Sequence, residues 1–169
     1  MVKTFGAVLL LASGLALAAA PAFALEVDVK QVTKNPDGSV TYHFAVKTDK
    51  GETLAPGSDF VTIYNFAGLV EGSVKTPAGW EFTAADYGKT PTWNGYPVVM
   101  PVDMPGLSNL TWSPSKPVAG GVEVAGFSAT THIAATTDGE YAGQATRGMG
   151  GKSSEQAVIG HIQTPNFLP

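Results

Sequence analysis

The chain has 169 residues, no cysteine, and a formal net charge of −4 at neutral pH. The lack of cysteine excludes disulfide frameworks and thiol-anchored lipoproteins, and an acidic balance without any basic cluster argues against nucleic acid as a partner. Charged residues make up 14% of the chain, below the roughly 25% of typical soluble proteins. Such a composition is common in extracellular β-proteins and also in proteins that assemble or lie near a surface.

Residues 1–24 have the pattern of a secretory signal peptide. Lys3 supplies a short basic region, an apolar run follows, and Ala22-Phe23-Ala24 has the small-x-small form of a cleavage site. The alternative, a transmembrane anchor, is disfavoured because the apolar run is shorter than the ~20 residues that a span needs. Cleavage would leave residues 25–169 as a single domain with nine basic and fourteen acidic side chains, and a secreted or periplasmic location.

The first part of the mature chain predicts a β-hairpin. Apolar and charged residues alternate over residues 25–30, and residues 39–47 alternate again. Asn35-Pro36-Asp37-Gly38 separates the two runs, and it predicts a turn because proline presets φ and Gly38 can adopt a positive φ. One face of the second strand should carry four apolar residues, Val40, Tyr42, Phe44 and Val46.

The densest strand-forming pattern lies in residues 57–82. Phe60 to Phe66 form an apolar, β-branched and aromatic run, which predicts a strand buried on both faces. Farther on, Pro77-Ala78-Gly79 forms a corner in front of Trp80. We expect this indole to fill the core between two sheets, the alternative being an exposed ligand platform.

Residues 84–108 form the least regular region, with four prolines spaced through it. Because proline cannot donate to a central ladder, this region is predicted to be a long loop or an excursion at a sheet edge. Tyr87, Trp93 and Tyr96 are the candidate ligand-binding residues, since exposed rings on a proline-stiffened loop suit stacking against sugars or peptides. In the alternative interpretation, these rings cover the open end of the sandwich.

The remaining residues predict further short strands around 110–112, 121–131, 141–146 and 156–163. Val122, Val124 and Phe127 are expected to point inward across a kink at Gly126. A turn is expected at Asp138-Gly139, and a flexible loop over residues 148–154. About eight to nine strands with no helical period after the signal predict an all-β, antiparallel β-sandwich of immunoglobulin-like or jelly-roll type.

The sequence contains no complete motif for nucleotide binding, nucleophilic catalysis or metal binding. The Gly-Gly-Lys-Ser string at residues 150–153 lacks the first glycine of a phosphate-binding loop, and no G-x-S-x-G nucleophile elbow occurs. A zinc site would need three separate predicted strands to bring their histidines together, and the loop aspartates lack calcium-loop spacing. These residues are His43, His132, His161, Asp86, Asp103 and Asp138. We therefore assign no catalytic residue, no metal and no cofactor.

Four strings carry a resemblance to a known group. They are Asp59 to Gly68, Gly72-Ser73-Val74, Pro77-Ala78-Gly79-Trp80 and Asn109-Leu110-Thr111-Trp112. In these strings, and over roughly residues 57–131, the chain resembles bacterial exported proteins of unassigned role, many of which carry a PEP-CTERM sorting tail. The resemblance implies a shared sandwich and export, with no catalytic residue to carry over. Because the sequence reads Asn166-Phe167-Leu168-Pro169 where such a tail is expected, it implies a released or periplasmic protein.

Taken together, these features predict an exported, non-enzymatic β-sandwich that serves as a structural, matrix or adhesion-type binding module. Its expected partners are extracellular polysaccharide or protein, without nucleic acid and without stable membrane insertion. The alternative is a secreted carbohydrate-binding or carbohydrate-active protein, with acids supplied by the 84–108 loop and the Asp138 turn. Self-association through an uncharged edge strand is a further hypothesis.

Overall fold

The computed structural model describes residues 25–149 and 152–167, so the predicted signal peptide lies outside the described residues. Within them the chain forms eleven strands and no helix, and therefore no helix that could cross a bilayer. The strands are β1 (Leu25–Lys34), β2 (Val40–Thr48), β3 (Glu52–Thr53), β4 (Phe60–Phe66), β5 (Trp80–Ala85), β6 (Thr92–Trp93), β7 (Tyr96–Pro97), β8 (Ser108–Pro114), β9 (Glu123–Thr131), β10 (Thr136–Met149) and β11 (Lys152–Pro165).

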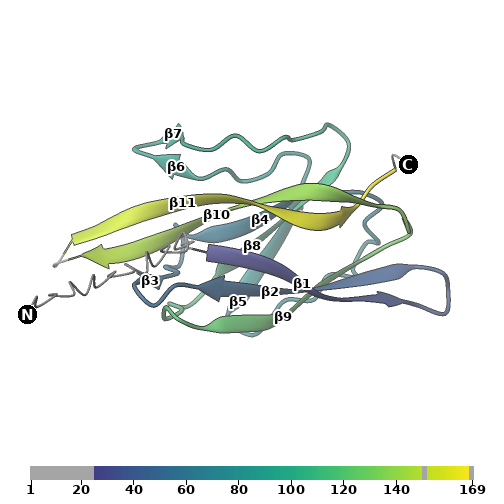
Figure 1. The fold of residues 1–169 in the computed structure, drawn as a ribbon, viewed down its shortest axis with the longest axis horizontal. Coiled ribbons are helices and arrows are strands. Elements are labelled where there is room, and N and C mark those ends of the chain that lie inside the picture. The colour runs from purple at the N-terminus through teal and green to yellow at the C-terminus, as the bar shows by residue number, and fades with distance from the viewer. Residues whose placement is uncertain (1–24, 150–151, 168–169) are drawn as a thin grey trace, which may run out of the picture.

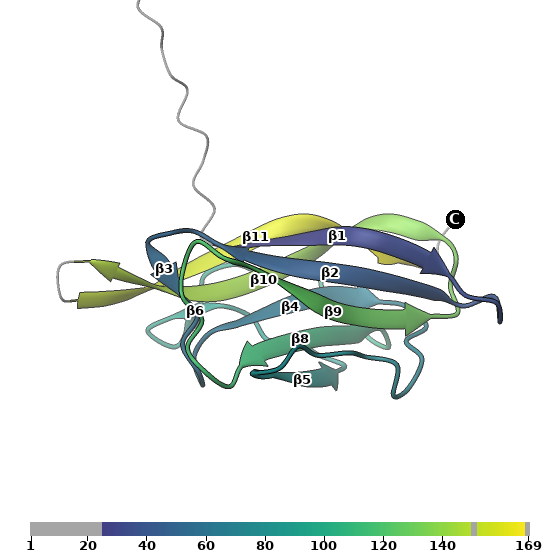
Figure 2. The same ribbon diagram turned by 90° about the horizontal axis from the view of Figure 1, so that it is seen from below.

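The strands form two antiparallel sheets that face each other, which confirms the predicted β-sandwich (Figures 1 and 2). Sheet A has the order β1-β2-β9. Sheet B has the order β11-β10-β4-β8-β5, and the short β3 pairs with the far end of β10. The strands β6 and β7 form a separate two-stranded hairpin.

The predicted first hairpin is present as β1 and β2, which pair along their whole length. Its turn closes with a hydrogen bond from the Gly38 amide to the Asn35 carbonyl at 3.0 Å, and Gly38 has a φ of 85°. All four apolar residues expected on one face of β2 are buried. The alternation of residue types was therefore sufficient to predict both the strands and their buried face.

The core between the sheets is built around aromatic rings. The Trp112 ring centroid lies 5.3 Å from Phe82 and 5.6 Å from Phe127. Trp80 is 8% exposed and packs edge-on against Phe127 at 4.9 Å, so its predicted core position is confirmed. Rings from both sheets meet here, because Phe127 belongs to β9 of sheet A and the two tryptophans to sheet B.

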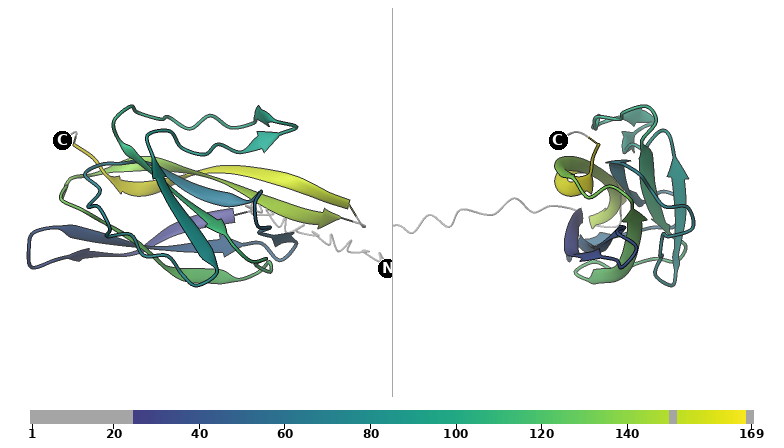
Figure 3. Two further views of the ribbon diagram at one scale, coloured as in Figure 1. Left: turned by 180° about the vertical axis from the view of Figure 1, so that it is seen from behind. Right: turned by 90° about the vertical axis from the view of Figure 1, so that its right-hand side faces the viewer.

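Strand β4 is buried on both faces, as its composition predicts. Val61 and Ile63 belong to the core between the sheets. On the other face, Phe60, Thr62 and Tyr64 are buried beneath residues 86–107. This segment forms a third layer over the outer face of sheet B, so the expected long loop is confirmed for it (Figure 3).

The predicted turn at Asp138-Gly139 is wrong, because both residues lie within the continuous strand β10. They pair with Gln163 and Ile162 of β11. A Cβ on Gly139 would lie 2.3 Å from Thr164 Oγ1, so close side-chain approach explains this glycine. The predicted loop at residues 148–154 is also shorter than expected, since β10 extends to Met149 and β11 begins at Lys152. Residues 150–151 lie outside the described part.

The predicted kink in β9 is a β-bulge. Phe44 of β2 pairs with Phe127 and Ala45 with Ala125, which leaves Gly126 as the extra residue, with a φ of 99°. Phe127 points into the core, as expected. Val122, which was expected to point inward, lies before the strand and is 39% exposed.

Candidate binding surface

Polar side chains of sheet B fasten residues 86–107 to its outer face. Asn109 is the centre of this network: its Nδ2 donates to the Asp86 carbonyl at 3.0 Å and to Asp103 Oδ1 at 2.9 Å, and its Oδ1 accepts from the Asn65 amide. The other Asp103 oxygen accepts from the Gly88 amide at 2.8 Å. Asp103, one of the acids considered for catalysis, therefore fixes the loop.

Two further parts of the segment, at Thr92 and at residues 102–104, are held by side chains of sheet B in the same way. Gln144 of β10 accepts a hydrogen bond from the Thr92 amide at 3.1 Å. At the other end, the Asn65 side chain donates to the Val102 carbonyl and accepts from the Met104 amide at 2.7 Å. Because Asn65 has a φ of 56°, the strand kinks here and turns its amide toward the segment.

The closest approach between the segment and the sheet is at Gly88 and Lys89. A Cβ on Gly88 would lie 2.1 Å from the Tyr64 ring, so only glycine fits. The Lys89 carbonyl accepts hydrogen bonds from the Tyr64 hydroxyl at 2.8 Å and from Thr62 Oγ1 at 3.0 Å. Burial raises the pKa of Tyr64. The Lys89 ammonium lies 4.3 Å from the centre of the Phe60 ring, and partial burial there lowers its pKa.

Beyond this anchor, the chain forms the small hairpin β6–β7. Trp93 pairs with Tyr96 across a two-residue turn in which Asn94 has a φ of 49° and Gly95 a φ of 81°. Positive φ at both central residues is the type I′ turn that favours Asn-Gly. This hairpin was not predicted, although the dipeptide Asn94-Gly95 is a specific signal for it.

The structure places the three candidate ligand-binding residues on the surface. Tyr87 is 77% exposed, Trp93 51% and Tyr96 76%, so Tyr87 and Tyr96 do not cover the end of the sandwich. Trp93 and Tyr96 lie together at the hairpin, whereas Tyr87 lines a separate pocket of about 310 Å³ beside β5 and β8. Their role in ligand binding stays a prediction.

Trp93 lines a pocket of about 500 Å³ between two hairpins. One wall is the β6–β7 turn, and the other is the end of β10 with the start of β11. The β6–β7 hairpin and the antiparallel pair β10–β11 extend toward the same end of the molecule (Figures 1 and 3). The pocket is lined by Ala55, Ser58, Trp93, Asn94, Thr146, Ser154 and Glu155. The sequence did not predict this pocket, because its walls are more than fifty residues apart in the chain.

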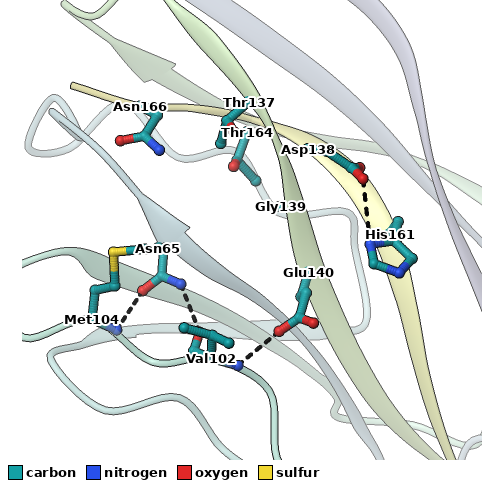
Figure 4. Close-up of a pocket in the computed structure, with 10 residues that line it drawn as sticks. All are labelled: Asn65, Val102, Met104, Thr137, Asp138, Gly139, Glu140, His161, Thr164 and Asn166. Atoms are coloured by element: carbon teal, nitrogen blue, oxygen red, sulfur yellow. Dashed lines mark hydrogen bonds and ion pairs between the residues drawn. The ribbon is translucent and has the colours of Figure 1, made fainter. Parts of the chain in front are cut away.

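A second pocket, of about 250 Å³, collects two acids and an imidazole between β10, β11 and residues 102–104 (Figure 4). His161 Nδ1 lies 3.5 Å from Asp138 Oδ2, and both side chains are more than 70% exposed. Glu140, opposite His161 in the ladder, accepts a hydrogen bond from the Val102 amide at 2.7 Å. No group of three or more metal-ligating side chains occurs among the residues that the structure describes.

Comparison with known proteins gives no assignment: no protein-family model matches the chain, and no curated protein is significantly similar to it.

Proposed function

We propose that this chain is an exported, non-enzymatic binding module of structural, matrix or adhesion type, and that residues 86–107 form its contact surface. One observation carries the proposal. Of the eleven exposed large apolar side chains in the described residues, seven lie in this segment: Tyr87, Trp93, Tyr96, Val98, Met100, Val102 and Met104.

The gathering of exposed apolar side chains in one segment supports an interaction site. The segment is also well ordered by its contacts with sheet B, so binding would cost little conformational entropy. The signal-like pattern of residues 1–24 and the resemblance to exported proteins support an extracellular partner, either polysaccharide or protein.

Adsorption to defined films tests this proposal. The mature chain, residues 25–169, is applied to films of cellulose and of gelatin, beside a Tyr87→Ala/Trp93→Ala/Tyr96→Ala triple variant. We expect retention on at least one film and its loss in the triple variant, because the removed rings supply the contact area. No retention on either film, or retention that the triple variant leaves unchanged, would overturn the proposal.

One observation favours a second candidate, a secreted glycoside hydrolase. Asp138 and Glu140 are two residues apart on the outward face of β10, so their Cα atoms are about 7 Å apart. Inverting glycosidases hold their two carboxyl groups roughly 6.5–9.5 Å apart. The exposure of Asp138, whose side chain is 77% exposed, weighs against it, since catalytic acids work best where water is excluded. Release of reducing sugar from neutral glycans, abolished by both Asp138→Asn and Glu140→Gln, would favour the hydrolase.

A further inference from the structure

The pocket between the two hairpins has one aromatic platform and a polar wall. Trp93 stands on one side with half of its surface exposed. Opposite it, Thr146 of β10 and Glu155 of β11 are direct partners in the ladder, and their side chains share the outer face of sheet B. With a volume of about 500 Å³, the pocket falls within the roughly 300–1,000 Å³ of small-molecule sites.

A buried carboxylate organises the polar wall. Asp59 is completely buried, and its Oδ2 accepts a hydrogen bond from the Ala55 amide at 2.7 Å. Its Oδ1 accepts from the hydroxyls of Ser58 and Thr146, both at 3.2 Å. A charged acceptor holds such groups in place more firmly than a neutral one. Because both hydroxyl protons point to Asp59, the oxygens present their remaining lone pairs as fixed acceptors.

We propose that this pocket is the subsite at which the binding surface takes up an uncharged polysaccharide, with one sugar ring stacked on Trp93. This inference rests on the proposed binding function and names its partner. The apolar C–H face of a sugar ring packs against the indole, whose face carries negative charge density. The ring's hydroxyls donate to the Ser58 and Thr146 oxygens and to the Glu155 carboxylate, and the Asn94 side-chain amide can both donate and accept.

The same lining disfavours other partners. Among the residues that the structure describes, no basic side chain lines the pocket, so this lining offers no positive charge to phosphate, sulfate or an acidic glycan, and Glu155 repels them. Peptide grooves provide apolar pockets for successive side chains, whereas the described part of this lining has one aliphatic side chain, that of Ala55. A chain of neutral hydroxylated rings fits both the single platform and the polar wall.

Affinity electrophoresis of the mature chain in gels containing barley β-glucan, xylan, mannan or dextran tests the proposal. We expect at least one polysaccharide to retard the wild type, and Trp93→Ala to weaken that binding at least about tenfold. Asn94→Gly should weaken it severalfold while it keeps the turn, since glycine accepts the positive φ at this position. Thermal unfolding of each variant verifies that it is folded.

Val32→Ala and Val122→Ala are the controls, because both side chains are exposed, and neither lines this pocket nor belongs to residues 86–107. They should bind within about twofold of the wild type. If Tyr87→Ala and Tyr96→Ala weaken binding as much as Trp93→Ala does, the pocket proposal fails while the contact surface of residues 86–107 stands. The same holds if the chain adheres to gelatin through this segment but no polysaccharide retards it. If it binds neither gelatin, cellulose nor any soluble polysaccharide, both proposals fail.

Discussion

The two faces of sheet B are covered in different ways. Its inner face meets sheet A through aromatic rings, with Trp112 in contact with rings of both sheets. Its outer face meets residues 86–107 mainly through hydrogen bonds, most of them between a side chain of the sheet and the backbone of the segment. One strand, β4, supplies residues to both faces.

This difference separates the stability of the molecule from its proposed function. Burial of apolar surface is the dominant favourable term in folding, so the inner face should determine whether the domain folds at all. Hydrogen bonds contribute less on balance but have strict geometry, so the outer face should determine where the exposed rings are held. We therefore expect substitutions on the inner face to change the stability of the whole domain, and substitutions on the outer face to change mainly how residues 86–107 are held.

The largest effect is expected on the inner face. Replacement of Trp112 by alanine removes a ring that is 1% exposed and leaves a cavity between the sheets, at a cost of about 3–5 kcal/mol. Urea unfolding would show a lower midpoint for the whole domain. Trp112→Phe is the control: it keeps an aromatic ring and removes an indole N–H that has no partner among the described residues, so it should cost much less. An equal loss in both variants would contradict the packing argument.

On the outer face, Asn109→Ala should loosen residues 86–107 while the two sheets of the sandwich stay folded. The variant loses three hydrogen bonds of a side chain that is 1% exposed, at a cost of about 1–3 kcal/mol. Hydrogen exchange should speed up at the amides of Gly88 and Met104, with little change at those of β2. Uniform acceleration throughout the domain would show that the two faces unfold as one unit.

Gly88→Ala tests how closely the segment lies on the sheet. The added methyl group would meet the Tyr64 ring at 2.1 Å, and such overpacking costs about 1–3 kcal/mol unless the segment moves away. A second substitution, Tyr64→Leu, should partly rescue the variant by making room. Gly51→Ala is the matched control, because no atom lies within 4 Å of the added methyl group there. A stable Gly88→Ala protein with unchanged exchange rates would contradict this contact.

Much of the sandwich could be predicted from the sequence, because hydrophobic period and turn chemistry are local. The alternation in β2, the turn ending at Gly38 and the continuous apolar run of β4 each specify their own structure. Trp80 could be placed in the core for the same reason, since it follows a glycine corner. The prediction failed at Asp138-Gly139, where a typical turn pair lies inside a strand because Gly139 makes room for Thr164.

The layer formed by residues 86–107 and the three pockets could not be predicted, because they depend on strand register and on pairs that are far apart in the chain. Gln144 and Thr92 are 52 residues apart, and Asp59 and Thr146 are 87 apart. Only the register of β10 against β11 places His161 opposite Glu140. The Asn94-Gly95 turn was the exception, since it has a local signal that the surrounding prolines obscured.

The smallest expected effect is a pH dependence of the free energy of unfolding. It comes from Glu52, an acid buried at the rim of the sandwich and away from the polar contacts of the outer face. The Glu52 side chain on β3 is fully buried and lies 2.8 Å from Arg147. Burial raises the pKa of Glu52 above its ordinary value of 4.5, although Arg147 opposes the shift. The second carboxylate oxygen of Glu52 has no partner among the described residues. This agrees with a cost of burying the charge that the Arg147 contact offsets only in part.

The folded protein therefore holds a proton on Glu52 at pH values where the unfolded chain has lost it. The resulting stability is fully present below about pH 4.5 and disappears as the pH rises through the folded-state pKa. Urea unfolding of the wild type between pH 4.5 and 7.5 should show this decline on top of other contributions. Glu52→Gln should flatten it, whereas Arg147→Met should steepen it, because the cation that lowers the pKa is gone. Identical slopes in all three proteins would mean that Glu52 keeps its ordinary pKa, and that water reaches this end of the sandwich.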